Sequence, residues 1–195
     1  MKVILKSAHP EEYGDLEIEC RELTREELTE YIANAPAEDK LVGTKTAPVE
    51  ARKGVPGEEI VTTLTITYEG REYIMSEVKN SVRERELADG TVQPDIVVTN
   101  VNSTSNEQYI VKFEKFEKMY TPNPDGTFTP VPDERPLTRV RENIAFTTSW
   151  GETVLCLAGS FIVTYNAAGH DYNALEKGAF ESTYSVVETP GVRLS

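Results

Sequence analysis

The chain has 195 residues, 33 acidic and 20 basic side chains, and a formal net charge of −13. Its 38% hydrophobic and 27% charged residues fit one globular domain or two small ones and argue against a chain disordered throughout. The excess of acid argues against direct nucleic-acid binding, because counterion release from phosphates requires Lys and Arg. Residues 1–50 hold twelve acidic and six basic residues, a net of −6, so this quarter carries almost half of the excess.

Two cysteines, Cys20 and Cys156, stand far apart and form no CxxC pair. This spacing favours two reduced thiols, with a single disulfide as the alternative. The apolar run at residues 3–5 is too short for a signal peptide or a membrane span. We therefore expect a cytoplasmic protein that contacts no membrane.

The N-terminal strands are predicted at residues 1–7 and 16–20. The second alternates apolar and acidic residues, which is typical of a half-buried strand and directs Glu17 and Glu19 to solvent. A carboxylate pair of this kind can serve acid–base chemistry. We favour a solvated face, because no nearby residue would shift either pKa.

The clearest helix is predicted over residues 24–34. Thr24 and Glu27 have the spacing of a capping box, and Leu28, Tyr31 and Ile32 form one apolar stripe. The opposite face is acidic and fits a basic protein surface, although an ordinary solvated face is the favoured alternative. The candidate partner-binding residues are Glu17, Glu19, Glu26, Glu27 and Glu30.

The middle of the chain is predicted to be mainly extended. Residues 35–57 are rich in Pro and Gly and predict a long connection with one short strand near Leu41. Residues 59–77 predict a hairpin that turns at Glu69 and Gly70. The charged segment 78–87 fits either a helix or an edge strand. We assign residues 1–90 to one acidic N-terminal α+β region.

An internal repeat is predicted in the second half. Phe116-Glu117-x-x-Tyr120 and Phe180-Glu181-x-x-Tyr184 lie 64 residues apart, and Tyr109 and Tyr172 lie 63 apart. Strand-like segments precede both motifs, so each copy is predicted to be a β-turn-β-helix module. Chance similarity is the alternative.

The repeat sets the remaining segment limits. Residues 91–136 hold the first module and a Pro-rich excursion, and residues 137–195 hold the second. The whole chain could also fold as one domain. We expect a polar turn at residues 102–106 and a frayed tail after residue 188.

The second copy carries a family resemblance. Residues 159–163 (G-S-F-I-V), followed by Phe180-Glu181-Ser182-Thr183-Tyr184, resemble the PGDYG-type module of phage and prophage proteins. Ser160 stands where that module has Asp, and the first copy, from Pro94-Asp95 to Tyr120, matches less well. The resemblance implies a phage or prophage setting and implies no activity.

Residues that could support catalysis are few. His9 and His170 stand in predicted turns without further metal ligands, and neither nucleotide-binding glycine motifs nor a nucleophile elbow occur. We therefore expect neither a catalytic residue nor a metal or other cofactor, with an uncharacterised enzyme as an alternative. An aromatic and polar patch is a candidate site for a small ligand such as a nucleotide, unless its rings pack on the core. Its residues are Trp150, Tyr165, His170, Asp171 and Tyr172.

The predicted fold class is α+β, with antiparallel twisted sheets, short helices packed on one face, and more strand than helix. The predicted function is a non-enzymatic, phage-type interaction protein with a basic protein partner, acting in the host cytoplasm. In its sharpest form this hypothesis is an inhibitor of a host defence protein that imitates the charge of nucleic acid.

Overall fold

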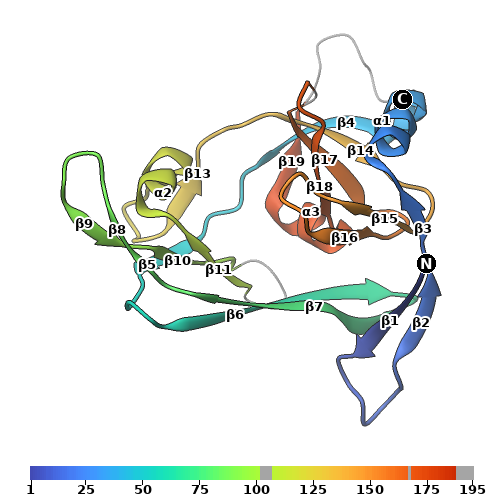
Figure 1. Ribbon diagram of the computed structural model, residues 1–195, viewed down its shortest axis with the longest axis horizontal. Coiled ribbons are helices and arrows are strands. Elements are labelled where there is room, and N and C mark those ends of the chain that lie inside the picture. The colour runs from blue at the N-terminus through green and yellow to red at the C-terminus, as the bar shows by residue number, and fades with distance from the viewer. Residues whose placement is uncertain (102–106, 167, 188–195) are drawn as a thin grey trace. The chain divides into compact units, whose positions relative to one another are not determined.

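The computed structural model describes residues 1–101, 107–166 and 168–187. Within these ranges the chain is strand-rich, with several antiparallel sheets and three short α-helices (Figure 1). The predicted excess of strand over helix is therefore confirmed. No helix among the described residues is both long enough and apolar enough to cross a membrane.

The chain divides into two compact units, each discontinuous in sequence. Unit 1 comprises Met1–Ile4, Leu16–Lys45 and the chain from Asp133 onward, and unit 2 comprises Leu5–Asp15 and Thr46–Pro132. The limits of the units do not coincide with the predicted segments 1–90, 91–136 and 137–195. The chain leaves unit 1 after Ile4 and again after Lys45, and it returns at Leu16 and at Asp133.

Unit 1 contains a five-stranded antiparallel sheet in the order β18-β17-β14-β4-β19, and a smaller sheet in the order β16-β15-β3. Its strands are β2 (Leu16–Glu19), β3 (Arg21–Leu23), β4 (Lys40–Lys45), β14 (Arg135–Arg139), β15 (Ile144–Thr147), β16 (Thr153–Cys156), β17 (Phe161–Asn166), β18 (Asp171–Leu175) and β19 (Tyr184–Val186). Its helices are α1 (Arg25–Asn34), the 3₁₀ turn η1 (Ala37–Asp39) and α3 (Lys177–Thr183).

Unit 2 contains the sheet β11-β10-β5, the hairpin β12-β13 and two further hairpins, β6-β7 and β8-β9. Strand β1 (Lys2–Ser7) begins in unit 1 and ends in unit 2, where it pairs with β7. The other strands are β5 (Glu50–Lys53), β6 (Glu59–Tyr68), β7 (Arg71–Ser81), β8 (Glu84–Glu86), β9 (Val92–Pro94), β10 (Ile96–Thr99), β11 (Gln108–Val111), β12 (Tyr120–Pro122) and β13 (Phe128–Pro130). The helix is α2 (Phe113–Met119).

Helix α1 forms where the capping signal predicted it. The Thr24 side chain accepts a hydrogen bond from the Glu27 backbone N–H, and the Glu27 carboxylate accepts one from the Thr24 N–H. These bonds satisfy backbone donors that a helix leaves free in its first turn. Leu28 is 1% exposed and anchors the helix in the core of unit 1.

Strand β17 divides the core of unit 1 into two layers. Ile162 faces α1 and the β15-β16 hairpin, whereas Phe161 and Val163 face α3. The ring of Phe161 lies 4.2 Å from that of Phe180, centroid to centroid. Both faces of the central strand are buried, which explains why its sequence is a continuous apolar run.

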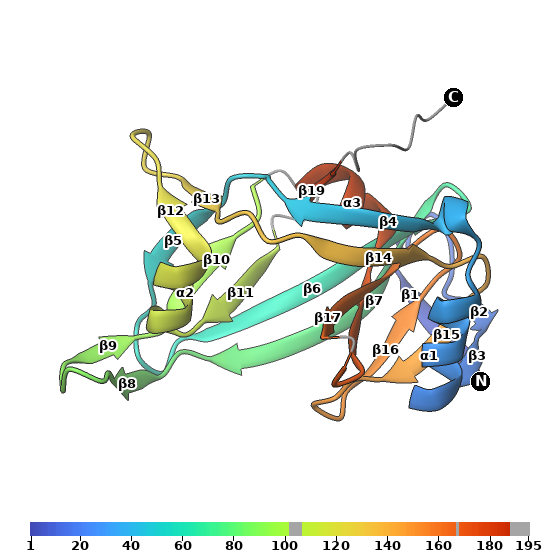
Figure 2. The same cartoon turned by 90° about the horizontal axis from the view of Figure 1, so that it is seen from above.

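Strand β10 has the same arrangement in unit 2. Ile96 and Val98 face α2, and Val97 packs on the opposite side against Ile60 of β6. Helix α2 lies along one face of β5, β10 and β11 (Figure 2). In both units, therefore, the sheet carries a helix on one face and an inserted hairpin on the other.

The pairing registers align the two units residue by residue. Ile96 of β10 pairs with Lys53 and Val111, as Phe161 of β17 pairs with Arg139 and Leu175. Through β11, α2 and β12 the counterparts therefore stand 64 residues apart, as Val111 and Leu175 do.

This spacing corrects one sequence match. Tyr109 pairs with Val98 and Asn173 pairs with Val163, so Tyr109 and Asn173 are counterparts. Tyr172 corresponds to Gln108 instead. The predicted match of Tyr109 with Tyr172 is wrong by one residue. Because successive residues of a strand point to opposite faces, the Tyr172 side chain lies on the face opposite to that of the Tyr109 counterpart, Asn173.

The two copies exchange their first strands. Strand β4 precedes β5 in sequence but pairs with β14 and β19 in unit 1. Strand β13 precedes β14 but pairs with β12 in unit 2, and its Phe128 bridges Val49 beside β5. In unit 2 the sheet β11-β10-β5 and the hairpin β13-β12 are joined by the single Val49–Phe128 bridge, and in this arrangement they follow the strand order of unit 1.

Several local predictions are settled as well. The hairpin turn at Glu69 and Gly70 is confirmed, with φ of 49° and 76° as a type I′ turn requires. The undecided segment 78–87 is extended, and residues 35–57 contain β5 as well as β4. The predicted turn at 102–106 and the tail after residue 188 lie outside the described residues.

Candidate functional site

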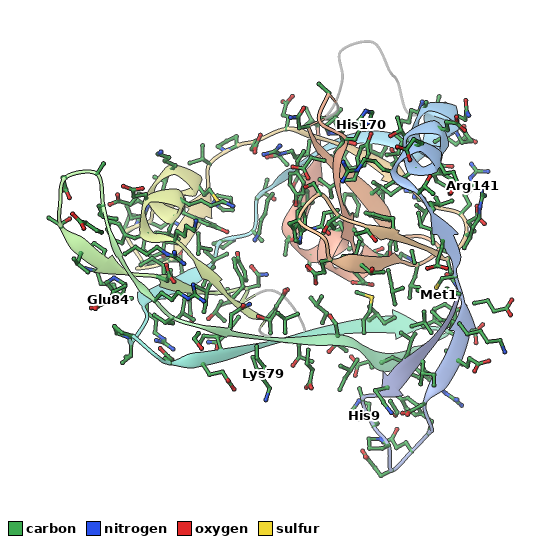
Figure 3. All side chains as sticks on the ribbon, in the orientation of Figure 1. Met1, His9, Lys79, Glu84, Arg141 and His170 are labelled. Atoms are coloured by element: carbon green, nitrogen blue, oxygen red, sulfur yellow. The ribbon has the colours of Figure 1, made fainter. Side chains whose placement is uncertain are left out.

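A hydrogen-bonded cluster joins α1 to the turn between β17 and β18 in unit 1. The Thr29 hydroxyl lies 3.1 Å from Nδ1 of His170, which is labelled in Figure 3, and 3.2 Å from the Tyr172 hydroxyl. It also lies 2.9 Å from the Arg25 carbonyl, to which it can donate. Thr29 thus links α1 to both side chains, and the donor in its contact with His170 depends on the tautomer of the imidazole.

Two more of the predicted ligand-binding residues lie on the β15-β16 turn or beside it. Asp171 accepts a hydrogen bond from the Ser149 hydroxyl at 2.6 Å. The Trp150 side chain is exposed, and its indole N–H donates to Glu152 at 3.0 Å. The Trp150 indole is therefore held by its own turn and has no hydrogen bond to His170 or Tyr172.

Tyr165 belongs to a separate contact. The Arg135 guanidinium lies 4.9 Å from the centre of its ring and donates to its backbone carbonyl at 3.0 Å. Burial raises the pKa of the Tyr165 hydroxyl, although 40% of the residue's surface is exposed. The structure thus joins His170 and Tyr172 through Thr29, and leaves Tyr165 and Trp150 in contacts of their own.

The predicted partner-binding carboxylates are all exposed in unit 1. Glu17 forms an ion pair with Lys2 at 2.7 Å, and Glu27 is used by the capping box. Among the described residues, no ion pair neutralises Glu26 or Glu30, which lie one turn apart on α1. Helix α1 thus presents two carboxylates that form no ion pair next to the Thr29 cluster.

A cavity of about 400 Å³ opens beside the C-terminal half of α1. Arg141, which is labelled in Figure 3, lines it, with Nε donating to Asp39 at 2.5 Å and Nη2 to Glu38 at 2.9 Å. The Arg141 backbone N–H donates to the Tyr31 hydroxyl at 3.3 Å. The lining residues are Arg21, Glu27, Glu30, Tyr31, Asn34, Ala35, Pro36, Asp39, Arg139 and Arg141.

This cavity was not predicted from sequence. Its arginines and carboxylates come from segments about a hundred residues apart, so no local motif marks them. Because three arginines and three carboxylates line it, the cavity has no strong preference for the charge of a ligand. It includes two of the predicted partner-binding residues, Glu27 and Glu30, and none of the predicted ligand-binding residues.

A second cavity, of about 460 Å³, lies between α2 and β5 in unit 2. Four of its ten lining residues are aromatic. Phe116 stacks on Tyr120 with centroids 5.0 Å apart and meets Phe128 edge-on at the same distance. The lining residues are Ala51, Arg52, Lys53, Ile96, Phe113, Phe116, Glu117, Tyr120, Pro122 and Phe128. We call this cavity the α2 groove. The sequence pattern assigned these rings to the core and did not reveal the opening.

The thiols are placed for packing. Cys20 and Cys156 are free and buried, and burial raises the pKa of both. A buried neutral thiol is a poor nucleophile, because the thiolate is the reactive form. Within the residues that the structure describes, no three His, Cys, Asp or Glu side chains gather as a metal site.

Comparisons with protein-family models, with curated proteins and with solved structures found no match to this chain. The resemblance to the phage module therefore stays a prediction.

Proposed function

We propose that this chain is a non-enzymatic interaction protein whose acidic surface binds a basic surface on another protein. The proposal rests on Glu26 and Glu30 of α1, which are exposed and form no ion pair among the described residues. In a chain of net charge −13, they stand on a helix with no basic residue in its last turn. Such a surface steers a cationic partner toward it and repels anionic ones.

The surroundings of this helix support the proposal. The capping box fixes the start of α1, Leu28 anchors its inner face, and Thr29 is held by His170 and Tyr172. A charged face on a fixed helix loses less conformational entropy on binding than one on a mobile loop. The setting that we propose is a phage or prophage protein in the host cytoplasm. The narrower form is an inhibitor that occupies the nucleic-acid site of a host defence protein.

We also propose the α+β class for the fold. The supporting observation is that α2 and α3 each cover one face of an antiparallel sheet.

The test is quantitative capture of proteins from a bacterial lysate on the immobilised full chain. We expect a basic partner whose capture falls in high salt, in competition with duplex DNA, and in a Glu26→Gln/Glu30→Gln variant. The matched control is Glu84→Gln/Glu86→Gln, which removes the same charge from exposed positions in unit 2. Capture that is insensitive to salt, or that falls equally in both variants, would contradict the proposal.

A further inference from the structure

The outer edge of β5 in unit 2 is open beside the α2 groove. Along its inner edge, β5 pairs with β10 from Glu50 to Lys53, and the next residue, Gly54, donates to the Asp95 carbonyl at 2.9 Å. Alternation in an antiparallel ladder then turns the backbone groups of Ala51 and Lys53 outward. Within the described ranges, no strand pairs with that side of these two residues. Among the residues that the structure describes, the Lys53 carbonyl accepts one contact, from the Arg52 guanidinium at 3.5 Å.

The same edge is filled in unit 1. The counterparts of Val49 and Ala51 are Arg135 and Leu137, which pair with Gly43 and Leu41 of β4. Leu41 packs against Leu137 in the cluster that also contains Phe161 and Phe180. In unit 1, therefore, the edge is completed by a strand that places a leucine, Leu41, opposite Leu137.

Unit 2 lacks this part of the strand because β13 is short. Phe128 corresponds to Gly43, and it exchanges two 2.8 Å backbone hydrogen bonds with Val49. The residues before it, which would reach Ala51, form a turn instead. Asn123 and Thr127 close that turn through a 2.8 Å backbone bond, and Gly126 adopts a φ of 87°. Pairing on the outer side of the edge therefore ends at Val49, because its partner Phe128 directly follows the turn.

The groove next to the open edge suits an aliphatic side chain. Ala51 stands where unit 1 has Leu137, so less of the space between sheet and helix is filled. Phe113 and Phe116 line the groove, and the Lys53 ammonium lies over the Phe113 ring at 5.6 Å. At the far end of the edge the Lys53 side chain carries a positive charge, which a carboxylate on an added strand would complement.

We propose that the open edge of β5 binds an extended segment of a partner protein as an added antiparallel strand. The segment has an acidic residue opposite Lys53, any residue opposite Arg52, leucine opposite Ala51 and an aliphatic residue opposite Glu50. Backbone hydrogen bonds supply the affinity and the α2 groove selects the leucine. The template is this chain's own Lys40–Val42, which pairs with β14 in unit 1 and so cannot serve unit 2, and Asp39 precedes it in sequence.

The first test is a peptide titration of the ¹⁵N-labelled full chain by NMR. The probe is the blocked peptide Glu-Asp-Lys-Leu-Val, which has the sequence of residues 38–42. We expect shifts of the Ala51 and Lys53 amides and of the Phe113 and Phe116 signals, with the Leu137 amide unchanged. Absence of shifts up to the solubility of the peptide, or shifts confined to unit 1, would overturn the proposal.

Two N-methylated peptides form a matched pair. N-methylation of the leucine removes the N–H that would bond to Ala51, whereas N-methylation of the lysine removes one that points away from β5. We expect the first change to weaken binding about tenfold, since it removes one hydrogen bond and adds a clash at the edge. The second change should retain binding. Equal binding of the two peptides would exclude strand addition.

The protein variants are Ala51→Pro and Ala51→Ser. Proline removes the outward N–H without touching the bonds to β10, and edge strands tolerate it there. We expect loss of peptide binding with proline and retention with serine. If Ala51→Pro does not fold, the N-methylated pair decides. If light scattering detects a dimer of the unliganded chain and the dimer buries β5, the occupant of the edge is a second copy of this chain, and the proposal of a partner segment is overturned.

This inference goes beyond the proposed acidic surface, because the two surfaces lie in different units. Loss of capture in the Glu26→Gln/Glu30→Gln variant with normal peptide binding would leave the β5 site standing. The reverse result would leave the acidic surface standing.

Discussion

Unit 1 and unit 2 share one strand order and differ at one edge. In both, a central apolar strand separates a helix from an inserted hairpin, and a Phe of the helix together with the Tyr that follows the helix packs in the core beneath it. In unit 1 the strand β4 covers four positions of β14, from Arg135 to Thr138. In unit 2 the equivalent cover ends at Val49. The module therefore folds both with this edge paired along its length and with the edge paired only at its first position.

The two units also place different polar side chains at one equivalent buried position. Asp95 and Ser160 precede the equivalent strands β10 and β17, and both are almost fully buried. The Asp95 carboxylate accepts from Arg85 Nε at 2.8 Å and from the Arg83 backbone N–H at 3.0 Å. The Ser160 hydroxyl accepts from the Lys177 N–H at 3.1 Å. Both side chains accept a hydrogen bond from the backbone of a neighbouring segment, but only Asp95 is a carboxylate.

The largest expected effect is the loss of an aromatic ring from the centre of unit 1. Phe161 is 2% exposed and contacts Phe180, so Phe161→Ala should lower the free energy of unfolding by about 3–5 kcal/mol. Its counterpart Ile96→Ala should cost about 2–5 kcal/mol. Urea denaturation of both variants checks this. An effect below about 1 kcal/mol at either position would contradict the equivalence of the two cores.

The next effect is expected at the paired buried polar residues. Asp95→Ala removes two hydrogen bonds to a carboxylate and should cost about 2–3 kcal/mol, whereas Ser160→Ala removes one neutral bond and should cost about 1 kcal/mol. Thermal unfolding of the two variants measures the difference. A larger loss for Ser160→Ala would reverse the proposed roles.

A smaller effect is expected where β5 approaches its neighbours. A Cβ at Gly54 would lie 2.6 Å from both Cγ atoms of Val82 and 3.1 Å from the Asp95 carbonyl. Gly54→Ala should therefore destabilise the chain by about 1–3 kcal/mol through overpacking. Gly14→Ala is the matched control, because no atom lies within 4 Å of its added Cβ. Similar melting temperatures for the two variants would show that Val82 yields.

The smallest effect is a pH dependence confined to unit 2. Hydrogen bonds from Arg52 and from the Val55 N–H lower the pKa of Glu58 to about 2. A depressed folded-state pKa gives stability that is present above the ordinary Glu pKa and is lost as pH falls toward about 2. Glu58→Gln should remove this part of the acid sensitivity. NMR titration of the Glu58 carboxyl tests the cause, and a midpoint near the ordinary value would contradict it.

Local signals in the sequence predicted much of the fold. The capping box of α1, the turn at Glu69 and Gly70, and the repeated Phe-Glu-x-x-Tyr motif each rest on residues within a few positions of one another. The exchange of β4 and β13 could not be predicted in this way. The exchange depends on which of two similar sheet edges each strand pairs with, and no local signal in the sequence of β4 or β13 indicates that choice.

The candidate sites show the same limit. The exposure of Glu26 and Glu30 follows from helical periodicity and was predicted. The Thr29 contact with His170 joins residues 141 apart and was not. The α2 groove was missed because Phe116 and Tyr120 also serve the core, and only the short β13 leaves space beside them.

Residue-resolved hydrogen exchange of the Ala51 and Leu137 amides tests the central claim most directly. The two residues are counterparts, and only Leu137 has a strand, β4, on its outer side among the described residues. We predict slow exchange at Leu137, fast exchange at Ala51, and slowing at Ala51 when the Glu-Asp-Lys-Leu-Val peptide is added. Equal protection of both amides without the peptide would contradict the account.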